Sequence, residues 1–406
     1  MSTQDLSGTP GVAFAFEDLL ARSAELRERG GPVHHDEERG IWRALDHPTV
    51  SRVLSDPAAF SSDFSGLTPV QEDFETFRKG NFVGMDPPDH RKLRTLVTQA
   101  FTPRVVAGLE PRIRAIAGEL LDEVDGASRI DVVDALAYPL PIIVIAELLG
   151  VPVADRPLFT RWAQVLFSGD QLGESADMAD IQRALDAIAP TIREMNAYIL
   201  DHIRQHRARP GDGLTSRLVQ AEFNGERLED QEIVGFVALL LIAGHITTTA
   251  LLGNAVVSFD RHPHAAAVLR AAPAGLPTAL EEVLRMLPPF PELGRRTTSD
   301  LDLGGRVIPA NSIVMADLAA ANRDPAHFDR PAEFDARRSP NPHLTFGHGI
   351  HFCFGAPLAR LEGRVAFEVL FERYRDLAVA SDDGVEFQNP AVIVSVKRLP
   401  VDVKSA

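Results

Sequence analysis

Apolar residues recur at intervals of three and four along most of this chain, which is the spacing that one face of an α-helix requires. The clearest run spans residues 110–208, where Ile113, Ile116 and Leu120 mark one face. Prolines within this run predict that it divides into several helices. Further helices are predicted over residues 13–30, 46–56, 89–101 and 277–287, and from Ala356 to about residue 375.

The most informative helix is predicted over residues 229–259. Its start is acidic, as the helix dipole favours, and residues 236–242 are apolar all round. A helix without a polar face must be buried in the core of a large fold. Its middle reads Ala-Gly-His-Ile-Thr-Thr-Thr over residues 243–249. A glycine and three hydroxyl side chains weaken a helix, and such a departure inside a buried helix indicates a site.

The pattern predicts few strands. Residues 301–303 and 306–308 flank Gly304-Gly305 and predict a hairpin, and a strand follows over residues 312–318. A small strand is predicted at residues 40–43, and short strands in the C-terminal tail. The fold class is therefore mainly α with a small β-rich part.

Residues 60–83 show no clean period and predict a long loop. This stretch contains Phe64, Phe74, Phe77 and Phe82. Because four exposed phenylalanines would be costly, we expect some of them to face a cavity. Residues 168–174, which contain glycine, predict a break between helices.

Composition narrows the class of protein. The 406 residues contain no linker, repeat or low-complexity run that would mark a boundary, and 45% are hydrophobic, so a single domain over residues 1–406 is expected. The net charge of −16 argues against nucleic-acid binding. We find neither a signal-peptide pattern nor an uncharged apolar stretch of membrane-spanning length, so we expect a cytoplasmic protein without a membrane span.

Cys353 is the only cysteine, so an internal disulfide and a cysteine-rich metal site are both excluded. Glycines at 347, 349 and 355 free the backbone around it, phenylalanines supply apolar walls, and Pro357 predicts a helix start. A helix N-terminus stabilises a thiolate. A single thiolate in such a loop suits the axial ligand of a haem iron, whereas an inert buried cysteine is the alternative.

The spacing Phe346-x-x-Gly349-x-x-x-Cys353-x-Gly355 resembles the haem-binding loop of the cytochrome P-450 superfamily, and the resemblance extends over nearly the whole chain. It implies a mainly α, single-domain fold with a small β-rich lobe. It also implies haem b (iron protoporphyrin IX) bound through Cys353. The activity implied is that of a soluble bacterial monooxygenase, which inserts one oxygen atom of O2 into a C–H bond of a small organic substrate.

The resemblance assigns further residues to the haem. In the family, some residues contact the haem, and several of these contact its propionates. The matching residues here are His90, Arg94, Arg295, His351, Phe346, Gly355 and Ala243. His90 and Arg94 lie four apart on one helical face, and a solvated basic face is the alternative. Arg296 is the rival of Arg295.

The resemblance also assigns the middle of the long helix to oxygen chemistry. Gly244 would let the haem and O2 approach the backbone, and Thr247 matches the threonine that hydrogen-bonds O2. The family's acid is replaced by Ile246, so proton delivery would depend on Thr247, Thr248, water, a substrate hydroxyl or His245. For Thr249 we expect core packing.

Glu282 and Arg285 match the family's buried structural pair, although spacing alone allows Glu281 as the partner. A third, downstream partner is expected at Arg330 or Arg337. The substrate-pocket candidates by resemblance are Phe82, Val83, Phe236, Leu240, Phe290, Glu292, Leu293 and Ile393. Glu292 could pair with a substrate amine.

The implied partners are a ferredoxin and a ferredoxin reductase, which would dock at a basic patch around Arg104, Arg112 and Arg360. The substrate class by resemblance is a bulky secondary metabolite such as a polyketide or macrolide. Two alternatives remain open. Ile246 allows a peroxide-driven or nitric-oxide-reducing enzyme of the same haem-thiolate type, and a haem carrier or sensor is the alternative outside enzymes.

Overall fold

The structure is a computed structural model that describes residues 13–65, 72–167, 178–380 and 384–406. The chain forms two compact units, each built from separate segments. Unit 1 comprises Met1–Ser61, Arg112–Tyr138 and Thr247–Ala406. Unit 2 comprises Ser62–Pro111 and Pro139–Ile246. The expectation of a single domain over the whole chain therefore stays a prediction.

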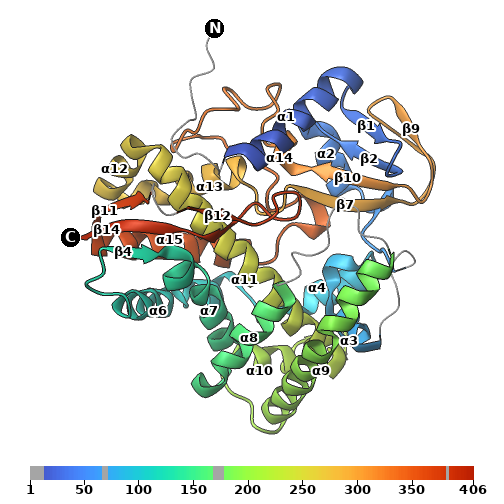
Figure 1. The fold of residues 1–406 in the computed structure, drawn as a ribbon. Helices are drawn as coiled ribbons and strands as arrows, with labels where there is room; N and C mark the ends of the chain where they lie inside the picture. The colour runs from blue at the N-terminus through green and yellow to red at the C-terminus, as the bar shows by residue number, and fades with distance from the viewer. Residues whose placement is uncertain (1–12, 66–71, 168–177, 381–383) are drawn as a thin grey trace. The chain divides into compact units, whose positions relative to one another are not determined.

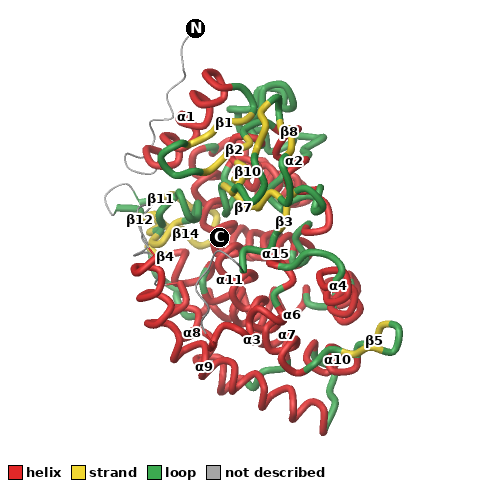
Figure 2. Tube along the Cα trace, turned by 90° about the vertical axis from the view of Figure 1, so that its right-hand side faces the viewer, coloured by secondary structure: helices red, strands yellow, loops and turns green. Residues whose placement is uncertain are grey.

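Unit 1 contains a five-stranded sheet, whose strands lie side by side in one layer (Figure 2). Strands β2 and β10 are parallel, and the other neighbours are antiparallel. An apolar core that includes Val33, Leu54, Phe60 and Val314 packs against it. The order of the strands is β1 (Val33–Asp36), β2 (Ile41–Ala44), β10 (Ile313–Asp317), β7 (Glu292–Thr297) and β3 (Phe60–Ser61).

The remaining strands of unit 1 are short. The predicted hairpin forms from β8 (Leu301–Leu303) and β9 (Arg306–Ile308), and its two glycines have positive φ, as a tight turn requires. The tail forms strands as predicted. They are β11 (Tyr374–Val379), β12 (Glu386–Phe387), β13 (Val396–Arg398) and β14 (Pro400–Ser405). Strand β4 (Arg129–Asp131), which was not predicted, pairs with β14.

Helices contribute more residues than strands do in both units, which confirms the predicted fold class. Those of unit 1 are α1 (Ala13–Gly30), α2 (His47–Ser55), α12 (Pro263–Ala271), α13 (Leu276–Met286), α14 (Leu318–Ala321), α15 (Ala356–Arg373) and nearly all of α6 (Glu110–Asp122). Those of unit 2 are α3 (Glu72–Gly80), α4 (Asp89–Ala100), α5 (Pro103–Ala107), α7 (Pro139–Leu149), α8 (Arg156–Phe167), α9 (Met178–Ala208) and α10 (Leu214–Gln220).

The long helix α11 (Asp230–Arg261) runs unbroken from residues of unit 2 into residues of unit 1 (Figure 1). It is the only helix of the described residues that is long and apolar enough to cross a membrane, but 67% of its most apolar window is buried inside the protein. Burial therefore accounts for its all-round apolar sequence, as predicted.

Helix α11 crosses α3 at very short range within unit 2. A Cβ atom on Gly235 would lie 2.5 Å from the Thr76 carbonyl oxygen, and one on Gly80 would lie 2.2 Å from the Phe236 amide nitrogen. Only glycine fits at both positions, because every other residue would drive its Cβ into backbone.

The predicted loop over residues 60–83 is wrong at residues 72–80, which form α3. This helix is polar on most of its surface, and contacts from α9 hold it. The Arg193 guanidinium donates two hydrogen bonds to the Asp73 carboxylate, and Asn196 donates one to the Asp73 carbonyl. The strand β1 was also missed. The expected break at residues 168–174 lies outside the described residues.

Candidate functional site

Cys353 lies in a tight loop that directly precedes α15. Gly347 and Gly349 have φ values of 74° and 71°, a conformation that favours glycine. The Cys353 amide donates a 2.7 Å hydrogen bond to the Phe346 carbonyl, which closes the loop. The cysteine is half-buried, and the neighbouring Phe352 ring is 40% exposed. The loop therefore places a half-buried cysteine beside a partly exposed apolar residue.

The loop is fixed against α2. A Cβ atom on Gly349 would lie 2.7 Å from the Ser55 Cα atom and 3.1 Å from the Leu54 carbonyl oxygen. Both the backbone conformation and the contact with α2 therefore require glycine at this position. Asn322 adds a second anchor, because its side-chain oxygen accepts a 2.7 Å hydrogen bond from the Leu344 amide.

Helix α15 begins at Ala356, three residues after the cysteine, with Gly355 as its N-cap and proline in its first turn. This confirms the predicted helix start. The unpaired N–H groups of a first turn favour negative charge nearby. Helix α15 packs on the end of α11 through a Phe259–Phe367 ring contact. Gly363 of α15 sits against Leu251, where a Cβ atom would come within 3.2 Å.

A buried ion-pair network joins α13 to residues 338–341. The Glu282 carboxylate accepts two 2.8 Å hydrogen bonds from Arg285, and both side chains are fully buried. Arg338 donates to the same carboxylate at 3.0 and 3.1 Å, and Asn341 donates at 3.1 Å. The structure thus confirms Glu282 as the partner of Arg285.

The predicted third partner of this pair is wrong. It is Arg338, and not Arg330 or Arg337. Arg330 is exposed and pairs with Asp329 and Glu333. The sequence does not distinguish a buried arginine from exposed arginines close to it in the chain. The structure shows that Arg338 is the buried one.

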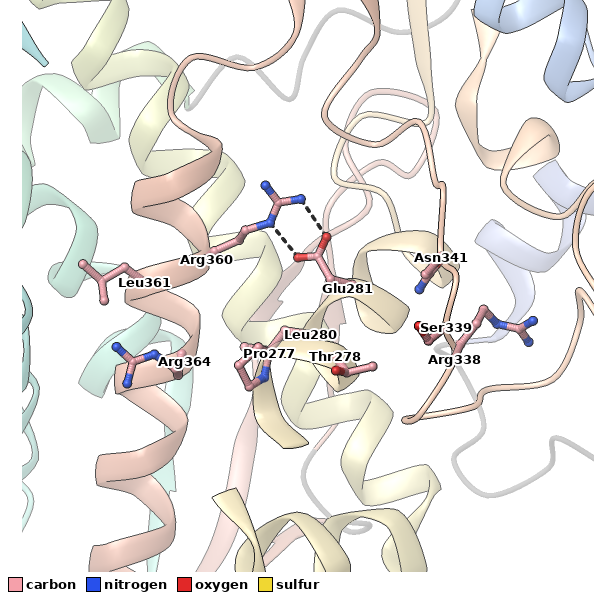
Figure 3. Close-up of a pocket in the computed structure, with 10 residues that line it drawn as sticks. All are labelled: Pro277, Thr278, Leu280, Glu281, Arg338, Ser339, Asn341, Arg360, Leu361 and Arg364. Atoms are coloured by element: carbon pink, nitrogen blue, oxygen red, sulfur yellow. Dashed lines mark hydrogen bonds and ion pairs between the residues drawn. The ribbon is translucent and has the colours of Figure 1, made fainter. Parts of the chain in front are cut away.

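Glu281 has a separate role next to this network. It pairs with Arg360 of α15 through two hydrogen bonds of 2.7 and 2.8 Å, and with His343 at 3.2 Å. Burial raises the pKa of Glu281, but the hydrogen bonds from Arg360 and His343 outweigh it and lower the pKa to about 2. The pair lines a cavity of about 470 Å³ between α13, α15 and residues 338–341 (Figure 3).

This pairing changes the predicted basic patch. Arg360 is neutralised by Glu281, and Arg112 is paired with Glu119 at 2.7 Å. Both arginines stay partly exposed, so they can still contact a partner. Arg104 lies exposed at the start of α5.

The burial pattern of α11 is interrupted in its middle. Ala243 is exposed, and Gly244, Ile246 and Thr247 are half-buried, although Leu241 is fully buried. The middle of the helix is therefore less buried on one side than the residues before it. Thr248 is buried and 3% exposed. Thr249 donates a 3.0 Å hydrogen bond to the Ala137 carbonyl, which confirms its expected place in the core.

Gly244 has a packing contact that the sequence did not predict. A Cβ atom at this position would lie 2.9 Å from the Cδ1 atom of Ile145 on α7. The glycine therefore allows α7 and α11 to approach one another. This contact explains why a glycine is needed at position 244 without reference to the predicted approach of haem and O2.

Arg295 and His351, both predicted to contact propionates, belong to unit 1. Arg295 lies on β7, is 8% exposed and donates a 2.7 Å hydrogen bond to the Gly294 carbonyl. Its rival Arg296 points to the other face of the strand and bonds the Asn311 side chain at 2.7 Å. Because neighbouring strand residues point to opposite faces, only one of the two can face a haem, and Arg295 stays the predicted one. His351 is half-buried in the 3-10 turn Gly349–His351.

Unit 2 brings together four of its predicted site residues. The Phe82 ring contacts the His90 ring at 5.9 Å and the Phe236 ring at 6.1 Å between centroids. The Arg94 guanidinium lies 5.6 Å from the Phe82 ring centre. Burial lowers the pKa of His90, and the charge of Arg94 lowers it further.

The other pocket candidates lie in different environments. Ile393 is buried in a turn whose next residue, Val394, is bonded to Pro289 and Asn254. Leu293 packs against the apolar core of the sheet. Leu240 is half-buried, whereas Phe290 and Val83 are 39% and 50% exposed.

Glu292 forms an ion pair with Arg43 of β2, a partner that the sequence did not predict. Burial and the nearby Asp317 carboxylate outweigh the effect of Arg43 and raise the pKa of Glu292 to about 7. The predicted pairing with a substrate amine would therefore have to compete with an internal guanidinium.

The side chains at the predicted positions have the chemistry that a haem group requires, a thiol for its iron and N–H donors for its carboxylates. A half-buried thiol at a helix start suits haem iron. Arg295 and His90 are buried, and Arg94 and His351 are half-buried, so each could meet a carboxylate with little water between them. Within unit 1, the partly exposed Phe352 offers apolar surface next to the thiol.

Comparison with known proteins gives a consistent result. The family model described as cytochrome P-450 matches residues 25–272 and 276–404. Cyclomarin C epoxidase from Salinispora arenicola is 41% identical over 368 residues, which cover 91% of this chain and 92% of that protein. Erythromycin C-12 hydroxylase from Saccharopolyspora erythraea is 42% identical over 398 residues, which cover 97% and 96%.

Solved structures agree with the sequence relatives. The crystal structure of HmtT, which is involved in himastatin biosynthesis, has a TM-score of 0.84 at 44% identity and covers 92% of this chain and 94% of that one. The ligand-free structure of TbtJ1 has a TM-score of 0.87 at 41% identity, with coverage of 98% and 100%.

Proposed function

We propose, from the premise that this chain belongs to the cytochrome P-450 family, that it is a haem-b monooxygenase that hydroxylates or epoxidises a bulky secondary metabolite. Membership and the monooxygenase class follow from the match over most of the chain and from named hydroxylase and epoxidase relatives. The observation that carries the haem assignment is the half-buried thiol of Cys353, held by a glycine loop at the start of α15.

The proposed haem site uses residues in distinct roles. Cys353 would ligate the iron. His90, Arg94, Arg295 and His351 would hold the two carboxylates, while Phe346, Gly355 and Ala243 would contact the ring. When bound, the haem supplies the activation of O2. The protein orients the substrate and excludes water from the reacting atoms.

Proton supply is assigned to the middle of α11. The Thr247 hydroxyl is half-buried on the exposed side of the helix, and we assign it the hydrogen bond to O2, with Thr248 and Gly244 next to it. Ile246 cannot carry a proton, so the hydroxyl of Thr247 would receive its proton from water or from a substrate hydroxyl.

The relatives support the proposed substrate class. A cyclomarin epoxidase and an erythromycin hydroxylase each match more than nine-tenths of this chain. We therefore propose a macrolide, polyketide or peptide natural product as substrate. The pocket would include Phe82, Val83, Phe236, Leu240, Phe290, Glu292, Leu293 and Ile393.

Electrons would come from a ferredoxin and its reductase in the cytoplasm. Arg104 is exposed, and Arg112 and Arg360 stay partly exposed, so an acidic ferredoxin could contact them. Alanine at Arg104 should slow reduction and leave substrate affinity intact. An unchanged reduction rate would remove Arg104 from the docking surface.

Ile246 favours a second candidate function. A haem-thiolate enzyme without the family's acid could use peroxide, which brings its own protons and electrons, or could reduce nitric oxide. Product yields with the ferredoxin system, with peroxide, and with NADH plus nitric oxide distinguish these chemistries. Yields that are higher with the ferredoxin system would support the main proposal.

The decisive experiment concerns the sulfur. The reduced protein under carbon monoxide should show the red-shifted Soret band of a thiolate ligand, and Cys353→Ser should lose it. Val307→Ala, on the exposed β8–β9 hairpin, is the control and should keep the band. A wild-type protein without the band, or a serine variant that retains it, would refute the haem-thiolate assignment.

A further inference from the structure

Unit 1 contains a second cavity, apart from all the residues assigned above to haem, substrate or electron donor. It has a volume of about 390 Å³ and lies among α1, the ends of α11 and α13, and residues 331–334. Its apolar wall includes Phe16, Leu20, Leu287 and Phe334, and its polar wall includes Arg261 and Arg323. This volume falls within the range of small-molecule pockets, about 300–1,000 Å³.

The two arginines carry buried N–H groups that no protein atom satisfies. The Nε and Nη2 atoms of Arg261 and the Nη1 atom of Arg323 are shielded from solvent and have no hydrogen-bond partner. The Arg323 guanidinium also lies 5.3 Å from the Phe16 ring centre. Native structures leave few such groups unsatisfied, so each one calls for a partner.

The carboxylates around Arg323 do not offset the cost of burying its positive charge. Burial and, to a smaller extent, the nearby cation of Arg285 lower the pKa of Arg323 to about 9. Glu282, Glu17 and Asp317 attract the guanidinium without offsetting these effects. Arg27, which also lines the cavity, is paired with Asp324 at 3.9 Å. The site therefore has an excess of positive charge that an anion would stabilise.

The apolar wall restricts the kind of anion. Phosphate or sulfate would place charged oxygens against Phe16 and Leu287, where no donor is available to them. A carboxylate on an apolar chain satisfies both walls. Its two oxygens can accept the N–H groups of two guanidiniums, and its chain can cover the aromatic and aliphatic side chains.

We propose that this cavity is a binding site for an amphipathic organic monocarboxylate of the medium-chain fatty-acid class. Its carboxylate lies between Arg261 and Arg323, and its chain packs against Phe16, Leu20, Leu287 and Phe334. The site is independent of the proposed substrate pocket, because the two share no residue.

The probe is a twelve-carbon fatty acid that carries a diazirine on its chain, used on the full-length haem-loaded protein. After illumination, peptide mass spectrometry should find adducts within residues 13–30, 286–287 or 331–334. Arg261→Gln should raise the half-saturation concentration of labelling roughly tenfold or more, because a charge-assisted hydrogen bond is lost. Arg306→Gln, a change at an exposed arginine of β9, should leave labelling unchanged.

Two further measurements test the cavity and the carboxylate separately. Ala24→Phe adds a ring at the cavity wall and should abolish labelling while both arginines remain. The matching diazirine alcohol should not label these peptides. The inference fails if the alcohol labels equally, if Arg261→Gln labels like the wild type, or if adducts appear only at pocket candidates such as Phe82 and Ile393. The carbon monoxide band tests the proposed function separately, since none of these variants should alter it.

Discussion

At the scale of the residue, Glu282 carries the largest electrostatic consequence. Two buried guanidiniums, those of Arg285 and Arg338, depend on its single carboxylate. Removing one partner of a buried ion pair leaves an uncompensated charge in a medium that solvates it poorly.

Glu282→Ala should therefore lower the free energy of unfolding by about 3–5 kcal/mol, measured by urea denaturation. Glu75→Ala is the matched control, because Glu75 pairs with Arg78 on the surface of α3 and both are nearly half exposed. Its effect should stay below about 1 kcal/mol. Equal midpoints for the two variants would contradict a structural role for the network.

Glu362 of α15 provides a prediction about pH. Its side chain is 1% exposed and its Oε2 atom has no hydrogen-bond partner. Burial raises the pKa of Glu362 to about 8 from an ordinary value of 4.5. The folded protein thus keeps this proton up to about pH 8, whereas the unfolded chain releases it near pH 4.5, so stability falls as the pH rises between these values.

Glu362→Gln cannot titrate, so it should lose less stability than the wild type between about pH 5 and about pH 8. The difference should be on the order of 1–4 kcal/mol, because each pKa unit corresponds to about 1.4 kcal/mol. Urea denaturation over this pH range measures it, and Glu386→Gln at an exposed position of β12 should follow the wild type. Parallel pH profiles for Glu362→Gln and the wild type would show that the carboxyl is ionised in the folded protein.

Single residues also show how far the sequence could be interpreted. Cys353, its glycines and the helix after it are neighbours in the chain, so their local pattern was sufficient for a prediction. The partners Arg338 and Glu282 lie 56 residues apart, and Arg43 and Glu292 lie 249 apart. No local pattern specifies which of several arginines reaches a distant carboxylate.

At the scale of the element, the crossing of α3 and α11 depends on absent side chains. Gly235→Ala should destabilise the protein by about 1–3 kcal/mol or more, because its Cβ would lie 2.5 Å from a carbonyl oxygen and 2.6 Å from the Gly80 amide nitrogen. Thermal unfolding of the purified variant measures the effect.

Gly118→Ala is the control for this prediction. Gly118 lies within α6, and a Cβ atom there would meet nothing within 4 Å. Because alanine favours helix more than glycine does, this variant should gain up to about 1 kcal/mol. The steric explanation would be wrong if both alanine variants changed the stability in the same direction.

The same scale explains which elements the sequence predicted. Helices with a continuous apolar face, such as α11 and α13, were found within a few residues of their ends. Helix α3 was missed because its sequence is mostly polar and α9 holds it through Asp73. Strand β1 reads Val-His-His-Asp, and only its pairing with β2 makes it a strand.

At the scale of the whole molecule, each unit is discontinuous in sequence. The chain leaves one unit for the other after residues 61, 111, 138 and 246, and the last of these points lies inside the continuous helix α11. Such connections favour cooperative unfolding, because one unit cannot lose its structure without breaking elements of the other.

The two tryptophans can test this, since Trp42 belongs to unit 1 and Trp162 to unit 2. Trp42→Phe leaves fluorescence that reports on unit 2, and Trp162→Phe leaves fluorescence that reports on unit 1. For each variant, we expect the unfolding midpoint measured by fluorescence to coincide with the midpoint measured by circular dichroism. A fluorescence transition that is separate from the circular dichroism transition would show two independently folding domains.

The network around Glu282 has a consequence for how such proteins can diverge. Apart from Glu282 and the Met286 sulfur, the hydrogen-bond acceptors of Arg285 and Arg338 are main-chain oxygens of residues 322, 329, 330, 331 and 333. Because every amino acid has the same main-chain carbonyl, we expect the residue types at 329–333 to vary among related proteins. We expect the length of this segment to stay constant, because an insertion or deletion would move the oxygens away from two buried cations.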